Sequence, residues 1–397
     1  MMKRKIKGLT GMAVILLLVV SLVLGGCSSS DKPSNGTGGQ AESYKIGAIL
    51  DISGTSSSLG VPERDTLLMM VDKINAQGGI QGHPIELLIE DNKSDETEAV
   101  LAANKLIEKD VVAILGCSAS GTTMAIVKPV QNAKIPLISM AAASSIVEPV
   151  AERQWVFKTA QSDIIMIKKI MEYLQKNSMT KIAFMYMNNA YGDNGKKAIE
   201  AAATQSGVSI VVEEKFDATD NDMTPQLTKV KSSGAQAVVV WAIPPSASIL
   251  TKNFKELGLT IPLIHSHGVG NQKFIELAQG AADGVILPIG KMIVADQIAD
   301  SDPQKAVLTQ YITDYQNKYQ SMPNSFGGYA ADALSILVAA IEKAGTDPAA
   351  LRDQLEKTQG LVGVSGIFTM TEQDHNGLSE DSTVMVQIEN DKWKLLQ

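Results

Sequence analysis

Cysteine is nearly absent from this chain, which has two in 397 residues, Cys27 and Cys117. If Cys27 carries a lipid, as argued below, Cys117 is left alone and no intrachain disulfide is possible. Cys117 is then either a reactive thiol or a small apolar residue, and we favour packing. Histidine is also scarce, with four residues. His265 and His267 lie two apart without a carboxylate or thiolate cluster, so we expect no metal site.

Signatures of enzymes are missing as well. The segment Gly116-Cys117-Ser118-Ala119-Ser120 differs from the nucleophile elbow Gly-x-Ser-x-Gly, because Ser120 stands where the motif requires its last glycine. No phosphate-binding loop or Gly-x-Gly-x-x-Gly follows a predicted strand, so we expect no nucleotide cofactor. Acidic pairs such as Glu90/Asp91 are more typical of solvated strand ends than of a catalytic dyad. We therefore expect no catalytic residues, no cofactor and no enzyme activity.

Aromatic residues make up 5% of the chain, and basic residues are outnumbered by acidic ones. The formal net charge is −8, and removing residues 1–26, which hold four basic and no acidic residues, gives about −12. An acidic surface of this kind excludes nucleic acid and anionic lipid as electrostatic partners. Attachment to a membrane therefore requires a lipid rather than charge.

The amino-terminal segment supplies such a lipid site. Basic residues at positions 3–7 precede an aliphatic run over 9–24, which closes on Gly25-Gly26-Cys27. This order is typical of an export signal, and the cysteine after small residues resembles the bacterial lipobox. A short transmembrane anchor is the alternative, but about 16 apolar residues fall below the ~20 needed to span a bilayer. We predict a lipoprotein signal peptide over 1–26, with lipid on Cys27, and a flexible Gly/Ser-rich linker over 27–43.

The remaining ~370 residues are too many for one core and predict two lobes. Short apolar runs alternate with amphipathic stretches from residue 44 onward, which is typical of repeated βαβ units. The strands are apolar throughout, so helices should cover both faces of the sheets. Expected strands are 45–50, 84–90, 111–115, 136–140, 181–186, 209–214, 237–241, 263–266, 284–289, 366–370 and 384–389. Expected helices are 64–77, 96–109, 122–133, 164–176, 194–205, 224–232, 247–257, 272–279, 305–319, 326–344 and 351–357.

In open parallel sheets, ligands bind beyond the carboxyl ends of the strands. The loop 116–123, which contains Ser120 and Gly121, follows one strand and opens a helix, so its N–H groups suit a carboxylate. Simple helix capping by Ser120 or Thr122 explains it equally well. The loop 139–145 is also made of small residues after a strand, and it has the same two interpretations, a carboxylate site or helix capping. Further strand-end loops are 187–192, which contains Tyr191, 241–246, which begins at Trp241, and 265–271.

Several segments, taken in order, resemble the branched-chain amino-acid type of periplasmic binding protein, the receptor of an ABC importer. They are Ile46-Gly47-Ala48 to Gly54, Ile74-Asn75-Ala76-Gln77-Gly78-Gly79-Ile80, Pro136-Leu137-Ile138-Ser139, Asn189-Ala190-Tyr191-Gly192, His267-Gly268-Val269-Gly270-Asn271 and Ala281-Ala282-Asp283-Gly284-Val285. The resemblance covers about 44–397. It implies an α/β, type I periplasmic-binding-protein fold, with two Rossmann-like lobes that have parallel-sheet cores and a three-stranded hinge. Lobe I would be 44–160 plus 290–360, and lobe II 161–289 plus 361–397.

The resemblance also implies roles for individual residues. Ser120 matches the position that holds a ligand carboxylate, and Ala141 and Ala143 fall on the second ligand loop. Leu59 matches a side chain over the apolar part of the ligand, and Tyr191 a residue of lobe II that closes on it. We expect Leu59, Ser120, Gly121, Ala141, Ala143, Ser144, Tyr191, Trp241 and His267 to bind the ligand.

Two of these positions depart from the family pattern. Ala143 replaces a threonine, for which backbone N–H groups or Ser144 would compensate. His267 replaces the acidic residue that pairs with the ligand's ammonium group, and a buried ammonium without a carboxylate costs several kcal/mol. The region 265–292 and the segment 374–378 resemble members linked to aromatic-acid uptake. We predict a small carboxylate ligand without a free α-amino group, such as an aromatic or acyl acid.

The protein is thus expected to be a monomeric solute-binding lipoprotein outside the cytoplasmic membrane. It would be held there through Cys27 and deliver its ligand to an ABC permease. A sensor for a membrane kinase or chemoreceptor would have the same fold and site, and remains an alternative. A lipid-anchored hydrolase using Ser118 or Ser120 is a second one, although it needs a histidine within reach.

Overall fold

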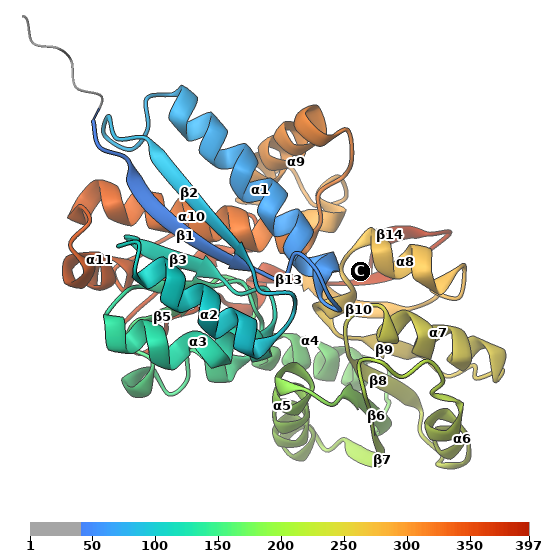
Figure 1. Cartoon of the computed structure of the whole chain (residues 1–397). Helices are drawn as coiled ribbons and strands as arrows, with labels where there is room; N and C mark the ends of the chain where they lie inside the picture. The colour runs from blue at the N-terminus through green and yellow to red at the C-terminus, as the bar shows by residue number, and fades with distance from the viewer. Residues whose placement is uncertain (1–40, 397) are drawn as a thin grey trace, which may run out of the picture. The chain divides into compact units, whose positions relative to one another are not determined.

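The computed structural model describes residues 41–396, which form one compact unit (Figure 1). The predicted signal peptide, Cys27 and the predicted linker up to residue 40 lie outside the described residues. The predictions of lipidation and of a tether therefore concern a part of the chain that the structure does not describe.

The first sheet consists of five parallel strands in the order β2-β1-β3-β4-β5. They are β1 (Tyr44–Leu50), β2 (Ile85–Asp91), β3 (Ala113–Gly116), β4 (Leu137–Ser139) and β5 (Val156–Lys158). Every residue of β3 and β4 is buried, because helices cover both faces of the sheet. The sequence patterns predicted four of these strands and missed β5, which has three residues.

The second sheet has seven strands in the order β14-β13-β10-β9-β8-β6-β7. Five are parallel: β6 (Lys181–Met187), β7 (Ser209–Phe216), β8 (Ala237–Trp241), β9 (Leu263–His265) and β10 (Ile286–Gly290). The last two strands, β13 (Thr383–Glu389) and β14 (Lys392–Leu395), pair antiparallel at one edge. A two-stranded hairpin, β11 (Leu361–Val362) and β12 (Ile367–Phe368), stands apart from both sheets.

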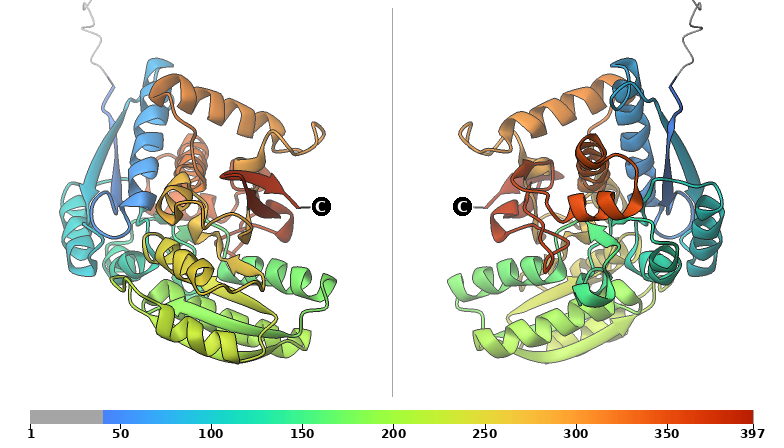
Figure 2. Two further views of the ribbon diagram at one scale, coloured as in Figure 1. Left: turned by 90° about the vertical axis from the view of Figure 1, so that its right-hand side faces the viewer. Right: turned by 90° about the vertical axis from the view of Figure 1, so that its left-hand side faces the viewer.

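Helices cover the sheets in two groups. Those around the first sheet are α1 (Ser57–Ala76), α2 (Glu96–Ile107), α3 (Ser120–Ala133), α9 (Lys305–Tyr319), α10 (Ser325–Ala344) and α11 (Pro348–Leu355). Those around the second are α4 (Asp163–Lys176), α5 (Ala190–Ser206), α6 (Thr224–Ser232), α7 (Ser246–Glu256) and α8 (Gln272–Ala278). We call each sheet with its helices a lobe. Figure 2 shows α1 and α9 together at one end and the green and yellow elements of the second lobe at the other.

Helix α10 returns late in the chain to the first lobe and packs along α1. It is the one helix among residues 41–396 that is long and apolar enough to cross a membrane, and 78% of its apolar window is buried inside the protein. That burial identifies it as a core helix. Tyr311 of α9 shares a hydrogen bond of 2.8 Å with Thr66 of α1, which fixes α9 to the same lobe.

Three chain segments connect the lobes, which is the number that the predicted hinge requires. The first follows β5, the second follows β10 at Gly290, and the third precedes β13. Asn376 Nδ2 donates to the carbonyls of Lys158 (3.2 Å) and Ala160 (3.0 Å). Gln161 Nε2 donates to the carbonyl of Ser365 at 2.7 Å.

The contacts of residues 363–376 are with the first lobe. Asp332 of α10 accepts hydrogen bonds of 2.7 Å from the N–H groups of Val364 and Ser365. The ring of His375 stacks on Phe157 of β5 at 4.2 Å. Glu380, by contrast, pairs with Lys168 of α4. We therefore propose that the chain passes into the second lobe near residue 379 rather than at residue 361.

Candidate ligand-binding site

A cavity of about 220 Å³ lies between the strand-end loops of the two lobes. An apolar cavity of ~150 Å³ holds benzene, so this space suits a ligand of one small ring or a short chain. Its walls are built from the start of α1 and α3, the loop after β4, the start of α5, the loop after β9 and one face of α10. The lining residues are 55–56, 59, 94, 96, 118–122, 140–142, 187, 189, 191, 218, 243, 267–268, 326 and 329.

The first-lobe wall is organised around Asp51, a fully buried residue that directly follows β1. Its Oδ2 atom accepts hydrogen bonds from the N–H groups of Ser118 and Ala119, both at 3.1 Å. Asn92 Nδ2 and Thr122 Oγ1 also donate to Oδ2, each at 3.2 Å. Burial raises the pKa of Asp51, and these four donors act against that rise. The carboxyl group therefore fixes the loop that leads into α3.

The amino end of α3 faces the cavity without a side-chain cap. The first N–H groups of a helix have no partner within it, and they attract negative charge. Ser120 Oγ accepts a hydrogen bond of 3.3 Å from the N–H of Ala143, which joins the two small-residue loops. A Cβ atom on Gly121 would lie 2.7 Å from Glu96 Oε1, so a side chain there would displace Glu96. The N–H groups at the start of α3 are donors suited to a carboxylate, and Glu96 is the acidic side chain beside them.

Ser118 is not available as a nucleophile in this arrangement. Its hydroxyl accepts a hydrogen bond of 3.0 Å from the Asp51 N–H and donates to Glu63 Oε2. Glu63 lies on α1, is fully buried, and has a pKa raised well above the usual value by burial. Its other oxygen, Oε1, has no hydrogen-bond partner among residues 41–396. The Ser118 hydroxyl thus serves a carboxyl group rather than a histidine base.

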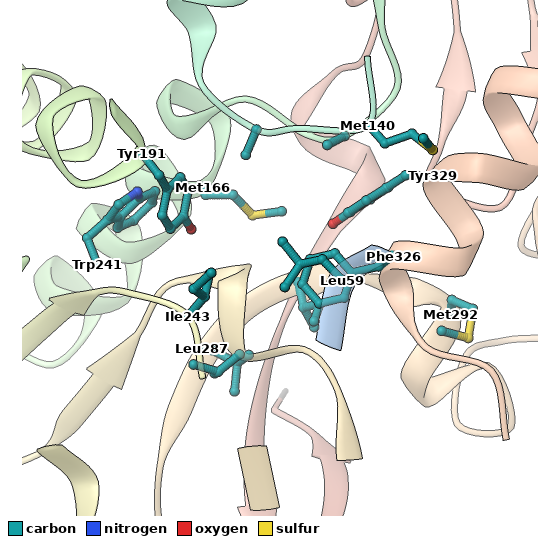
Figure 3. Packing of buried hydrophobic residues seen from close by; sticks show 14 of the residues in the cluster. Leu59, Met140, Met166, Tyr191, Trp241, Ile243, Leu287, Met292, Phe326 and Tyr329 are labelled. Carbon is teal, nitrogen blue, oxygen red and sulfur yellow. The ribbon is translucent and has the colours of Figure 1, made fainter. Parts of the chain in front are cut away.

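Three rings pack together at the second-lobe wall, with Tyr191 and His267 in the cavity lining and Trp241 behind them. Tyr191 opens α5, Trp241 ends β8 and His267 follows β9, and their ring centres lie 5.6 to 6.0 Å apart. Figure 3 shows the first two of these rings. Trp241 lies against Gly195 of α5, where a Cβ atom would come within 2.2 Å of the indole. The absence of a side chain at Gly195 therefore sets the position of Trp241, and Trp241 supports the other two rings.

Burial shifts the pKa values of the titratable residues at and behind this wall. Burial, and then the charge of Lys158, lowers the pKa of His267 to about 3, so its ring is neutral at physiological pH. Burial lowers the pKa of Lys158 to about 8. Burial also raises the pKa of Asp163 to about 7. The Oδ2 atom of Asp163 accepts a 3.4 Å hydrogen bond from the N–H of Ser144. Neither Lys158 nor Asp163 lines the cavity.

Six of the residues expected to bind the ligand line the cavity: Leu59, Ser120, Gly121, Ala141, Tyr191 and His267. Trp241 and Ala143 lie outside the lining, the first behind the rings and the second behind Ser120. Ser144 faces a different, wider groove of about 1490 Å³ along α5 and residues 148–154. That groove is too large and open for one small solute, and we assign it no ligand.

Phe326 and Tyr329 line the cavity from α10 and were not expected from the sequence. They lie about 60 residues after the last strand-end loop, on a helix whose apolar pattern predicts only core packing. Figure 3 shows both side chains pointing toward the rings of the second lobe. No short-range pattern reveals this placement, because it depends on how α10 packs along α1.

His265 and His267, considered above as a metal pair, point to different surroundings. His265 Nε2 shares a 2.9 Å hydrogen bond with Thr251 of α7 in the core, whereas His267 lines the cavity. Within the described range 41–396, no three His, Cys, Asp or Glu residues lie close enough to hold a metal ion. Cys117 is buried, and burial raises the pKa of its thiol well above the usual value.

Comparisons with known proteins agree with this geometry. The sequence profile of the periplasmic binding protein family matches residues 43–392. The leucine-, isoleucine-, valine-, threonine- and alanine-binding protein of Pseudomonas aeruginosa is 24% identical over 79% of this chain and 82% of that protein. A Leu/Ile/Val-binding protein homolog of Brucella abortus is 25% identical over 86% and 88%.

Solved structures show the same relationship. An extracellular ligand-binding receptor from Rhodopseudomonas palustris superimposes with a TM-score of 0.84 at 28% identity, covering 90% of this chain and all of that one. The branched-chain amino acid transporter substrate-binding protein of Streptococcus pneumoniae, solved with isoleucine, gives 0.79 at 26%, covering 89% and 98%. The chain therefore belongs to the periplasmic binding protein family, in its branched-chain amino acid type, and is an extracytoplasmic solute-binding protein rather than an enzyme.

Proposed function

We propose that the protein captures a small carboxylate without a free α-amino group between its two lobes and delivers it to an ABC permease. The observation that carries this proposal is His267, which lines the cavity as a neutral ring. A neutral imidazole offers one N–H donor and one acceptor, which suits a carbonyl or hydroxyl and does not compensate an ammonium charge.

The acidic groups near the cavity are poorly suited to replace a missing carboxylate partner. Glu63 does not line the cavity, burial raises its pKa well above the usual value, and its Oε2 atom accepts the hydrogen bond from Ser118. Asp163 lies behind the wall rather than in it. Glu96 alone lines the cavity with a carboxylate, and its side chain lies over Gly121 at the amino end of α3. An ammonium there would compete with the helix dipole.

A branched-chain amino acid is the second candidate ligand, because relatives are named for binding leucine, isoleucine and valine. The proposal also includes a lipid anchor at Cys27 and a monomeric state. The mechanism is a shift of population, because a ligand that contacts both walls stabilises the closed state over the open one. Sensing for a membrane kinase would use the same site, and a pull-down of the membrane partner separates the two roles.

Calorimetry on the purified full-length chain tests the ligand class. We expect binding of carboxylic acids that lack an α-amino group, among them benzoate and 4-methylpentanoate, and little response to leucine, isoleucine or valine. Micromolar binding of leucine or valine without any response to the acids would contradict the proposal.

A further inference from the structure

Two tyrosines enter the cavity from opposite lobes. Tyr191 comes from α5 of the second lobe and Tyr329 from α10 of the first, and their side chains are 7% and 2% exposed. Both line the cavity. Figure 3 shows their hydroxyl oxygens pointing toward the space between the two rings.

Neither hydroxyl has a hydrogen-bond partner within the described residues. Ser266 and Gly268 lie near Tyr191 Oη, but neither completes a hydrogen bond with it. Tyr329 is held by its backbone, where Thr159 Oγ1 donates to its carbonyl at 2.8 Å, while the phenol stays unpaired. A buried polar atom without a partner costs about 1–3 kcal/mol. Two such atoms facing one space therefore indicate a partner that comes from outside the chain.

The surrounding charges define the chemistry of that partner. Burial raises the pKa of both phenols, so each keeps its proton and donates at physiological pH. The charges that act on them belong to acids, with Asp163 acting on Tyr191, and Asp332 and Glu63 acting on Tyr329. A second carboxylate is disfavoured next to acidic groups. An uncharged oxygen, such as a hydroxyl or a keto group, fits two neutral phenols.

We propose that Tyr191 and Tyr329 form a subsite for an uncharged oxygen of the ligand, separate from the donors at the amino end of α3 that would take its carboxylate. The ligand is then a small hydroxy or keto acid. This inference rests on the proposed function, because it places the carboxylate elsewhere. Since one hydroxyl comes from each lobe, a ligand that reaches both hydroxyls stabilises the closed arrangement of the lobes.

Matched ligand pairs test the subsite by calorimetry on the full-length chain. The pairs are 4-hydroxybenzoate against 4-methylbenzoate, and 4-oxopentanoate against 4-methylpentanoate, so that only an oxygen is exchanged for a methyl group. We expect at least one oxygen-bearing acid to bind more tightly than its partner. Tyr191→Phe and Tyr329→Phe should each lower the affinity for that oxygen-bearing acid about 3- to 10-fold, the usual effect of one neutral hydrogen bond. The affinity for the methyl-bearing acid should not change.

Two controls make the result specific. Tyr173→Phe and Tyr315→Phe remove a tyrosine hydroxyl outside the cavity, one in each lobe, and should not change affinity. Without ligand, Tyr191→Phe and Tyr329→Phe should melt at the same temperature as the original chain or higher, because each removes an unpaired buried atom. A lower melting temperature would show that the hydroxyl is bonded within the protein, and would overturn the subsite.

The possible outcomes separate the two proposals. If acids bind but both members of each pair bind equally and the two variants bind like the original chain, the subsite is wrong and the proposed function stands. If the two variants lower the affinity for the methyl-bearing acids as much as for the oxygen-bearing acids, the tyrosines hold the carboxylate and the subsite is again wrong. If no acid binds, the proposed function fails and the subsite fails with it.

Discussion

On the first-lobe wall of the cavity, Asp51 receives four hydrogen bonds from its own protein. On the second-lobe wall and the facing side of α10, Tyr191 Oη, His267 Nδ1 and Tyr329 Oη accept or donate no hydrogen bond within the part of the chain that the structure describes. The Asp51 carboxyl is thus satisfied before a ligand arrives, whereas the opposite side presents polar side-chain atoms that remain unpaired. The comparison suggests that the first lobe supplies a fixed floor and that the ligand completes the other side.

The largest expected effect is on the fixed wall. Asp51→Ala should lower the free energy of unfolding by about 3–5 kcal/mol, because several buried donors lose their acceptor at once. Urea denaturation measures the change. Asp296→Ala, at an exposed position, is the control and should change it by less than about 0.5 kcal/mol. A small effect of Asp51→Ala would mean that the first wall is not held by this network.

The next effect concerns ligand class on the opposite wall. His267→Glu supplies a carboxylate where a neutral ring now stands, so leucine should bind about 100-fold more tightly, equivalent to about 2.7 kcal/mol. Acids without an amino group should bind more weakly, because the new carboxylate at position 267 repels the carboxylate of the ligand. Calorimetry with leucine and benzoate measures both. His83→Glu, outside the cavity, should change neither affinity. Unchanged leucine binding in His267→Glu would remove His267 as the determinant of ligand class.

Gly195→Ala tests how the second wall is supported. The new methyl group would overlap Trp241, and overpacking of this kind costs about 1–3 kcal/mol. We expect a loss of about 2 kcal/mol in the free energy of unfolding, and weaker ligand binding because Trp241 packs against Tyr191 and His267. Lys197→Ala, exposed on the same helix, is the control. Normal ligand binding in a destabilised Gly195→Ala would show that ring positions do not govern affinity.

The smallest expected effect, taken per unit of pH, is the dependence of stability on pH that Asp163 causes. Burial raises its pKa from 3.8 to about 7, so between about pH 4 and 7 the carboxyl is protonated only when folded. The free energy of unfolding should therefore fall as pH rises through this window, by at most about 1.4 kcal/mol per pH unit. Asp163→Asn should flatten this slope in urea titrations from pH 4.5 to 7.

Part of the slope should remain in that variant, because burial also raises the pKa of Asp332 to about 7. Lys158 makes the free energy of unfolding rise with pH, but only above its lowered pKa of about 8, which is outside the titrated range. Asp296→Asn is the matched control. A slope that is identical in Asp163→Asn and the original chain would show that Asp163 titrates normally.

Most helices and strands were predictable because their patterns are local. Helices α6 and α9 and strand β8 have the bounds expected from the apolar periodicity. Strand β5 was missed because three residues are too few for a pattern, and β14 because its burial depends on β13. The antiparallel edge formed by β13 and β14 depends on a chain return of about 90 residues, which no short window contains.

The site divides in the same way. Ser120, Ala141, Tyr191 and His267 lie in loops that follow predicted strands, so the strand-end rule selected these loops and the family resemblance selected the residues within them. Tyr329 and Phe326 lie on a helix that reads as core, and only its packing along α1 brings them to the cavity. Trp241 also follows a strand, yet Gly195 holds it behind the rings.

The sequence by itself determined the fold class, the two α/β series and the strand-end loops, because apolar periodicity and small-residue turns act over a few residues. Only the tertiary structure decided which polar atoms are satisfied and which are not. Hydrogen bonding between residues such as Asp51 and Ser118, 67 positions apart, depends on the meeting of strands and helices. The same long-range packing leaves Tyr191 and Tyr329 unpaired across the cavity, and it is there that the ligand is expected to be recognised.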